Sequence, residues 1–284
     1  MWFSLTIFVV RLQTWTVVAV IIAMIGLMGS PAGTAPIAVR FPQGIAHGFL
    51  LVRSSAGEII GHGEMTQVVK EGDLLDSRLV FNFKDGSLHD EKVTFSQQGV
   101  FSMLRYHLVQ RGPSFPDQIE VSIDRRTAEY KVRSRTGEEG KEEVLAGALT
   151  LPKDVYNGIF VTMLLNLPKG ASEIVNFLAF TPAPEIFKLE LQLTDEQHTV
   201  QIGELSRKAL HYIFKPDIGM IRELLGKATG KIPSHFHYDC WILADEVPSF
   251  VRFEGPLQLM GPVVRIELLS PRLLTKPEDK TASK

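Results

Sequence analysis

Residues 79–95 read LVFNFKDGSLHDEKVTF, and this stretch decides the fold. Leu79 to Phe83 is rich in residues that favour strands, and Lys92 to Phe95 supplies a second run of the same kind. The Asp85-Gly86 pair between them is a strong signal for a tight hairpin turn. The same succession of short strands and turns continues over residues 46–144, so we predict a meander of antiparallel strands.

The pattern changes from strand to helix at two places. Asp154 is a suitable N-cap for a helix that carries Val155, Ile159, Met163 and Leu167 on one stripe and ends before Pro168. Because its other faces are also apolar, we expect it to be buried, and the simplest partner is a sheet; a lid facing a ligand or lipid is the alternative. A second, amphipathic helix is expected from Asp217 to Gly230.

The fold class follows from the order of these elements. We expect about a dozen strands and two helices, without alternation of strand and helix, and this order argues against a parallel doubly wound fold. We predict a mainly β protein, built as a curved antiparallel sheet or half-open β-barrel, with one helix packed on the concave face. Gly61 and Gly63 within one strand predict a bulge or a sharp bend.

The first 35 residues resemble an export signal. The apolar run from Trp15 to Met28 suits a cleaved secretory signal, and small residues follow it. Trp2 to Val10 is apolar as well, with only Arg11 between the two runs, so retention as a membrane anchor is the alternative and a misassigned start codon is a third. We therefore expect export to the periplasm or cell envelope.

Composition limits the classes of partner. Removing residues 1–35 changes the formal charge from −2 to −3, which leaves no basic field to attract nucleic acid. Cys240 is the only cysteine, so an intramolecular disulfide is excluded, and we expect this side chain to be buried. Residues 36–275 are expected to form a single β-rich domain, followed by a disordered tail over 276–284. No pattern for a cofactor is present.

The closing part of the chain carries a resemblance. A Trp-containing strand, a short acidic turn and further strands follow one another here. Their residues are Trp241, Asp245, Val247-Pro248, the run Val251 to Glu254, and Val264 to Leu268. With the exported leader, the meander and the Pro-bounded helix before them, they resemble the unclosed-barrel carriers of the lipoprotein-localisation-factor superfamily. The resemblance implies a cavity for an apolar ligand. The chain departs from the lipid-anchored carriers because no cysteine follows its apolar leader.

The first functional hypothesis is therefore a non-catalytic carrier of a lipid or another apolar molecule, to which the membrane surface could deliver its ligand. Burial of apolar area would drive binding, with the first helix acting as a gate. The expected cavity-lining residues come from the strands and that helix: Phe81, Phe83, Phe95, Phe101, Val121, Ile123, Ile159, Phe160 and Met163.

The second hypothesis is a metal-dependent hydrolase. A strand places His235, His237 and Asp239 on one face, a spacing that suits zinc if His211 or another residue supplies a further ligand. The simpler interpretation is a polar strand face whose alternate residues, including Cys240, pack inward. A third hypothesis is an envelope scaffold with a filled core. The chain has no Gly-x-Ser-x-Gly or Gly-x-Gly-x-x-Gly motif, so no catalytic residue is assigned.

Overall fold

The computed structural model describes residues 34, 36–137, 140–181, 183–202, 204–217, 237–258 and 261–269. The chain divides into two units, Met1–Thr34 and Ala35–Lys284. The expected leader, the body of the expected second helix and the expected tail lie outside the described residues. In the described part of the chain, no helix is both long enough and apolar enough to cross a membrane.

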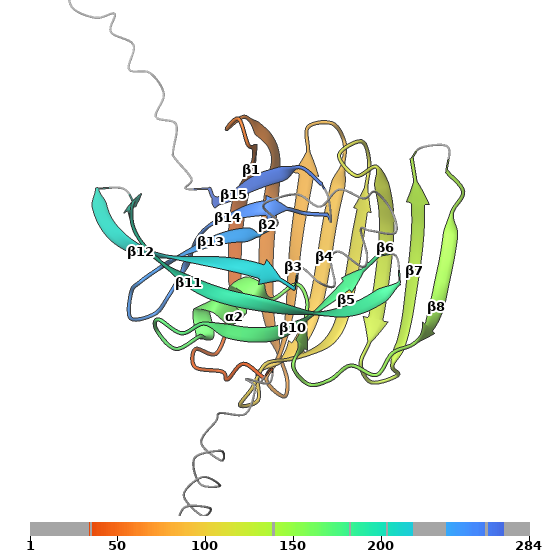
Figure 1. Ribbon diagram of the computed structural model, residues 1–284, viewed down its shortest axis with the longest axis horizontal. Coiled ribbons are helices and arrows are strands. Elements are labelled where there is room, and N and C mark those ends of the chain that lie inside the picture. Colours follow the sequence, from red (N-terminus) through yellow and green to blue (C-terminus); the bar gives the residue numbers. More distant parts are fainter. Residues whose placement is uncertain are drawn as a thin grey trace, which may run out of the picture. The chain divides into compact units, whose positions relative to one another are not determined.

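A single antiparallel meander forms the first half of the second unit (Figure 1). Its strands are β1 (Ala46–Ser54), β2 (Ile59–Lys70), β3 (Leu74–Phe83), β4 (Leu88–Ser96), β5 (Ser102–Arg111), β6 (Asp117–Asp124), β7 (Glu129–Thr136) and β8 (Glu143–Ala148). The predicted hairpin is confirmed: Asn82 pairs with Leu88, and Gly86 takes a positive φ of 85° in the turn. A left-handed backbone at that position favours glycine.

The second half continues the same sheet in the opposite direction. Its elements are β9 (Val155–Tyr156), the helix α2 (Phe160–Asn166), β10 (Glu173–Phe180), β11 (Pro184–Ile202), β12 (Leu205–Pro216), β13 (Tyr238–Leu243), β14 (Phe250–Pro256) and β15 (Val263–Leu268). The last strand, β15, pairs with β1, so the two halves meet in the middle of the sheet and β8 and β9 form its two edges. The sheet is therefore curved and unclosed, as the sequence predicts, with 15 described strands rather than about a dozen.

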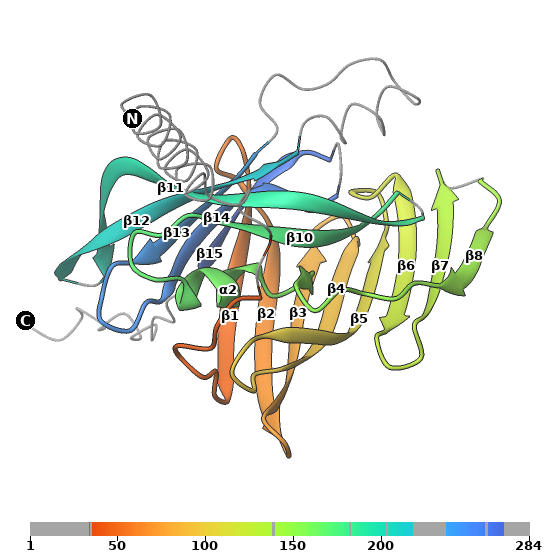
Figure 2. The same ribbon diagram turned by 60° about the horizontal axis from the view of Figure 1, so that its bottom comes forward.

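The two halves of the sheet face each other across the main hydrophobic core. Figure 2 shows β10 and β11 crossing over the strands of the first meander. Tyr106 of β5 stacks on Phe180 of β10, with ring centroids 6.0 Å apart and planes 6° from parallel. Val93, Phe95 and other inward residues of the first half belong to the same buried cluster as Leu191 of the second. Each half of the sheet thus covers the inward apolar face of the other, a role that a layer of helices would otherwise fill.

The helix is shorter than the sequence predicts. It spans Phe160–Asn166 rather than running from Asp154, because Gly158 takes a positive φ of 71° and interrupts the chain before it. Val155–Tyr156 instead pairs with β10 as the edge strand β9. Asp154 does not cap the helix, and its carboxylate accepts a hydrogen bond from Asn176 Nδ2 at 2.7 Å. Met163 of the helix is nevertheless fully buried in the main core, as expected.

The glycines of β2 allow close packing rather than a sharp bend at their own positions. A Cβ on Gly63 would lie 2.4 Å from Phe81 Cδ1, so this position has no room for a side chain. The irregularity that the sequence predicts here falls next to Gly61, because Val52 pairs with Gly61 and Arg53 pairs with Ile59. Phe81 can therefore pack closely against β2, in a second hydrophobic cluster beside β1 and β15.

Candidate metal centre

A bulge between β11 and β12 brings three ligand-type side chains together. Leu193 pairs with Tyr212 and Gln197 with Leu210, so three residues of β11, from Thr194 to Glu196, lie opposite the single residue His211. A bulge of this kind changes the direction in which side chains point. Here it directs Glu196 toward His211, and His198 follows two residues later on the same strand.

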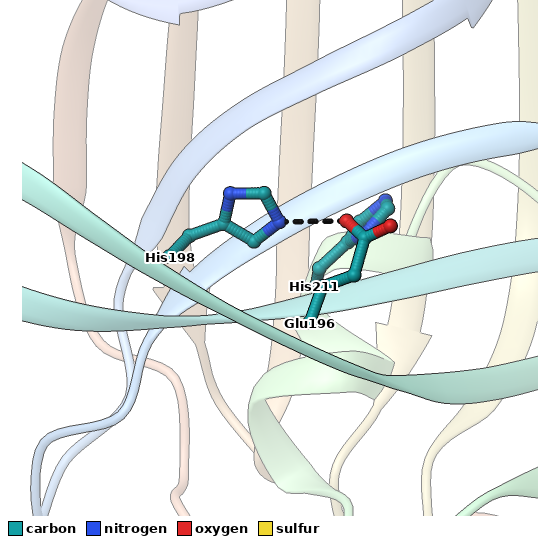
Figure 3. A group of neighbouring side chains, drawn as sticks. All are labelled: Glu196, His198 and His211. Atoms are coloured by element: carbon teal, nitrogen blue, oxygen red, sulfur yellow. Dashed lines mark hydrogen bonds and ion pairs between the residues drawn. The ribbon is translucent and has the colours of Figure 1, made fainter.

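The three side chains form a compact group, which we call the His–Glu centre: Glu196, His198 and His211 (Figure 3). Glu196 Oε2 lies 2.9 Å from His198 Nε2 and 3.2 Å from His211 Nδ1. One ligand atom from each residue can be chosen so that all three lie within 4.8 Å of one another. Of the residues described, this is the one group of three histidine, cysteine or acidic side chains with that property.

A second layer of side chains orients His211 from behind. Its Nε2 lies 2.7 Å from Asp239 Oδ1, and Asp239 Oδ2 lies 3.2 Å from His237 Nε2. With Nε2 protonated and donating to Asp239, Nδ1 presents its lone pair to the other members of the centre. A carboxylate behind a metal-binding imidazole is a common second layer in zinc proteins, where it fixes the ring and its tautomer.

Stacked rings hold His211 in place. Trp241 of β13 lies parallel to the imidazole, with centroids 4.4 Å apart and an angle of 2° between the planes. The guanidinium of Arg252 covers the other side of the indole, 3.9 Å from its centroid. The side chain of His211 is consequently only 8% exposed, whereas that of Glu196 is 65% exposed. The centre therefore combines a fixed inner ligand with an outer side that is open to solvent.

The electrostatics of the centre keep its carboxylate ionised. The close contacts of its carboxylate with the imidazoles of His198 and His211 hold the pKa of Glu196 below its usual value. An ionised carboxylate and neutral imidazoles are the forms that bind a metal. Bonds of 2.0–2.1 Å in a tetrahedral site put neighbouring ligand atoms about 3.3 Å apart. The two contacts at Glu196 Oε2, 2.9 and 3.2 Å, are close to that spacing.

The structure places the residues of the predicted metal site as follows. His237 and Asp239 lie beside His211, which the sequence offers as a further ligand, but both occupy the second layer. His235 lies outside the described residues. Cys240 is buried, as expected, and that burial raises the pKa of its thiol.

Two members of the centre, Glu196 and His198, are missing from the sequence-based site. Their signal is the same alternate spacing that draws attention to His237 and Asp239, because Glu196 and His198 also stand two apart. Both residues lie on β11, which runs from Pro184 to Ile202.

The expected lining of the apolar cavity packs into two hydrophobic clusters. Phe81 and Phe83 belong to the cluster beside β1 and β15, and the other residues belong to the main core or pack against it. Phe95 and Phe101 meet edge to face at 5.6 Å. All nine residues are buried except Phe160, which is partly buried. The cavity itself stays a prediction.

Comparison with known proteins gives no relative from which a role could be transferred. No protein-family model, curated protein or solved structure matches this chain.

Proposed function

We propose that this protein binds a divalent metal ion of the zinc class through Glu196, His198 and His211. The observation that carries the proposal is the convergence of both imidazoles on one carboxylate oxygen, at 2.9 and 3.2 Å. Two histidines and one carboxylate are the ligand set of many zinc sites that keep a fourth position for water or substrate. The exposure of Glu196 leaves room for such a position.

The ligand atoms have distinct roles in this proposal. His211 binds through Nδ1 while its Nε2 donates to Asp239, so the second layer fixes the protonation that binding needs. His198 binds through Nε2, the atom that faces Glu196. When bound, a zinc ion supplies Lewis acidity and lowers the pKa of a coordinated water, which makes metal-assisted hydrolysis the class of reaction to test first.

Carriage of an apolar ligand, the first hypothesis from sequence, stays a prediction. Its expected lining residues pack against one another in the described core, and no observation singles out a place for a ligand among them. The metal centre, in contrast, has defined donor atoms and a defined second layer.

Zinc titration of the chelator-treated full chain tests the proposal. We expect one zinc per chain by elemental analysis, and a loss of affinity of at least about 100-fold in the double variant His198→Ala/His211→Ala. Trp241 fluorescence should report binding, since its ring stacks on His211. His47→Ala is the matched control, because His47 contacts the carboxylate of Glu64 at 2.7 Å on the exposed face of β1 and β2.

Two results would contradict the proposal. One is the absence of stoichiometric zinc in the wild-type chain. The other is unchanged affinity in the double variant together with loss of zinc in His235→Ala, which would favour the ligand set expected from the local sequence. Unfolding curves of each variant show whether a loss of zinc reflects a loss of fold.

A further inference from the structure

The two edges of the sheet differ in how well they are protected. The edge strand β9 has only two residues, Val155 and Tyr156, and both are fully buried. The edge strand β8 has six residues, all of them exposed, and no described element lies beyond it (Figure 2). Edge strands are commonly protected by lysine, proline or a bulge. Residues 143–148 contain neither lysine nor proline, and their register with β7 continues without a shift, so β8 is open to pairing.

The backbone of β8 presents a row of unpaired groups at this edge. Leu149 donates a backbone hydrogen bond to the Ala128 carbonyl at 2.7 Å, and this pair continues the register of β7 and β8. In an antiparallel ladder, hydrogen-bonded and non-hydrogen-bonded pairs alternate along the strands. The odd-numbered residues of β8 therefore bond to β7, whereas the N–H and C=O groups of Val144, Ala146 and Ala148 point away from it.

The side chains of β8 are mostly apolar. Leu145 is 37% exposed and lies opposite the fully buried Val132, on the core side of the sheet. Val144 is 56% exposed on the other face. The one charged residue of the strand is Glu143. A strand laid along β8 would extend the core past Leu145 and remove this apolar surface from water.

Tyr130 adds a polar group at the same edge. It lies opposite Gly147 in the register of β7 and β8 and packs against the main core. A Cβ on Gly147 would lie 2.8 Å from the Tyr130 hydroxyl oxygen, so the far end of the ring covers Gly147 and reaches over the edge strand. In the described part of the chain, no residue is hydrogen-bonded to this hydroxyl. It can therefore donate to a carboxylate that a neighbouring strand supplies.

We propose that two copies of this chain pair through β8, antiparallel and about a two-fold axis, with Leu145 opposite Leu145 of the second copy. In this register the outward-facing backbone groups of Val144 bond to those of Ala146 in the second copy, and the two-fold axis repeats each contact. The two leucines meet on the core side, next to Val132 of each copy. The interface is independent of the metal centre, which lies on β11 and β12 in the other half of the sheet.

The polar side chains select this register. It places Glu143 opposite Gly147 of the second copy, in a non-hydrogen-bonded pair with Cα atoms about 4.5 Å apart, so the carboxylate accepts a hydrogen bond from Tyr130 of that copy. Like charges do not lie opposite each other within the paired strands. A shift by two residues instead brings Glu143 opposite Leu145 in one direction and opposite Leu149 in the other. Either shift moves the carboxylate away from Gly147.

Sedimentation velocity of the chelator-treated full chain over a concentration series tests the pairing. We expect a reversible monomer–dimer equilibrium with a dissociation constant in the micromolar range, because the contact is one short strand per copy. Ala146→Pro should weaken dimerisation at least about tenfold, since proline lacks the outward N–H but leaves the hydrogen bonds to β7 in place. The matched control Ala146→Ser keeps that N–H and should change the dissociation constant less than about twofold.

Tyr130→Phe separates pairing from folding. The ring still covers Gly147, so the thermal midpoint of the monomer should not change. Dimerisation should weaken at least about tenfold, because two symmetry-related hydrogen bonds are lost. Glu143→Gln should have a similar effect, and combining it with Tyr130→Phe should add little, since the two side chains form the same contact.

Cysteine cross-linking tests the register. Leu145→Cys should form an intermolecular disulfide, because its Cα lies about 4.5 Å from that of its counterpart. Ala146→Cys should not, because its counterpart is displaced by two residues, and the natural Cys240 is buried. A chain that stays monomeric, or association that Ala146→Pro leaves unchanged, would overturn the interface. Equal cross-linking at the two positions would overturn the register.

Discussion

Glu91 is a carboxyl group on the inward face of β4, where the two halves of the sheet face each other across the main core. It stands two residues before the buried Val93, and its carboxyl lies beside Gly158, the residue that interrupts the chain before α2. Tyr106 donates a hydrogen bond to it at 2.8 Å, and no cation among the described residues pairs with it. Burial raises the pKa of Glu91 to about 6, while the hydrogen bond from Tyr106 opposes that rise.

The substitution Glu91→Gln should abolish a loss of stability that the wild-type protein undergoes as the pH rises. A carboxyl whose pKa rises on folding stabilises the protein below its unfolded pKa of 4.5, and this contribution is lost as the pH rises to about 6. At about 1.4 kcal/mol per pKa unit, the loss is about 2 kcal/mol. The measurement is the free energy of unfolding in urea at pH 4.5, 5.5 and 7, as the difference between variant and wild type.

The control for Glu91 is Glu190→Gln, which removes an exposed carboxyl from the polar face of β11. The difference between this control and wild type should stay constant with pH. If the Glu91→Gln difference is equally constant, Glu91 does not titrate in this window and is not enclosed as described. Tyr106→Phe should enlarge the loss of unfolding free energy between pH 4.5 and 7, because the ionised Glu91 carboxylate then lacks the hydrogen bond from Tyr106.

At the scale of single elements, the sequence predicts those structural features that are set by residues close together in the chain. The β3–β4 hairpin is recognisable because Asp85-Gly86 sits between two strand-forming runs. The start of α2 is not, because the local cap signal of Asp154 competes with the left-handed turn at Gly158 and with pairing of Val155 and β10. That pairing joins residues far apart in the chain, and propensity does not report it.

The residues at the candidate metal centre likewise include some that the sequence identifies and others that only the register of two strands brings together. His237 and Asp239 attract attention because alternate residues of one strand share a face. Glu196 and His198 reach His211 only through the bulge between β11 and β12, and the register of two strands cannot be read from either strand alone. Sequence therefore identifies the neighbourhood of the centre, while the fold selects its ligands.

Arg125 fixes the segment that connects the two halves of the sheet. Its guanidinium donates hydrogen bonds to the backbone carbonyl of Met103 and to those of Leu151, at 2.6 Å, and Pro152, at 2.8 Å. The forked, planar geometry of arginine allows one side chain to serve several carbonyls at once, which lysine cannot do. The first strand of the second half, β9, thus begins at a position set by a residue of the first.

Arg125→Lys should therefore destabilise the protein by about 2 kcal/mol, because at least one partly buried carbonyl loses its donor while the positive charge remains. The measurement is the urea unfolding free energy. Arg126→Lys is the matched control, since the neighbouring Arg126 side chain is exposed, and it should change stability by less than about 0.5 kcal/mol. Equal effects of the two substitutions would mean that Arg125 contributes charge alone.

At the scale of the whole β-rich unit, one sheet supplies both layers around its own core. Strands β8 and β9 form the two edges of the sheet, and pairing of β1 with β15 joins its two halves in the middle. The main cluster takes residues from both halves, among them Phe95 on one side and Leu191 on the other. Neither half can bury its inward face without the other, so the two layers should fold as one unit.

Coincident unfolding of the two halves tests this coupling. Trp2→Phe/Trp15→Phe leaves Trp241, on β13, as the only tryptophan, so its fluorescence reports the second half while far-UV circular dichroism reports the whole sheet. With chelator present, the two signals should give the same midpoint in urea. In this background Phe95→Ala, a cavity in the first half, should lower the Trp241 midpoint by an amount equivalent to about 3–5 kcal/mol.

The decisive comparison is between Phe95→Ala and Phe49→Ala. Phe49 lies on β1 and its residue is 49% exposed, so its removal should cost much less than the removal of the fully buried Phe95. If Phe95→Ala shifts the circular dichroism signal but leaves the Trp241 midpoint in place, the halves unfold separately. In that case the contacts across the main core, including the stack of Tyr106 on Phe180, do not couple them energetically. A common shift instead means that a metal site on β11–β13 depends for its geometry on packing supplied by strands of the first half.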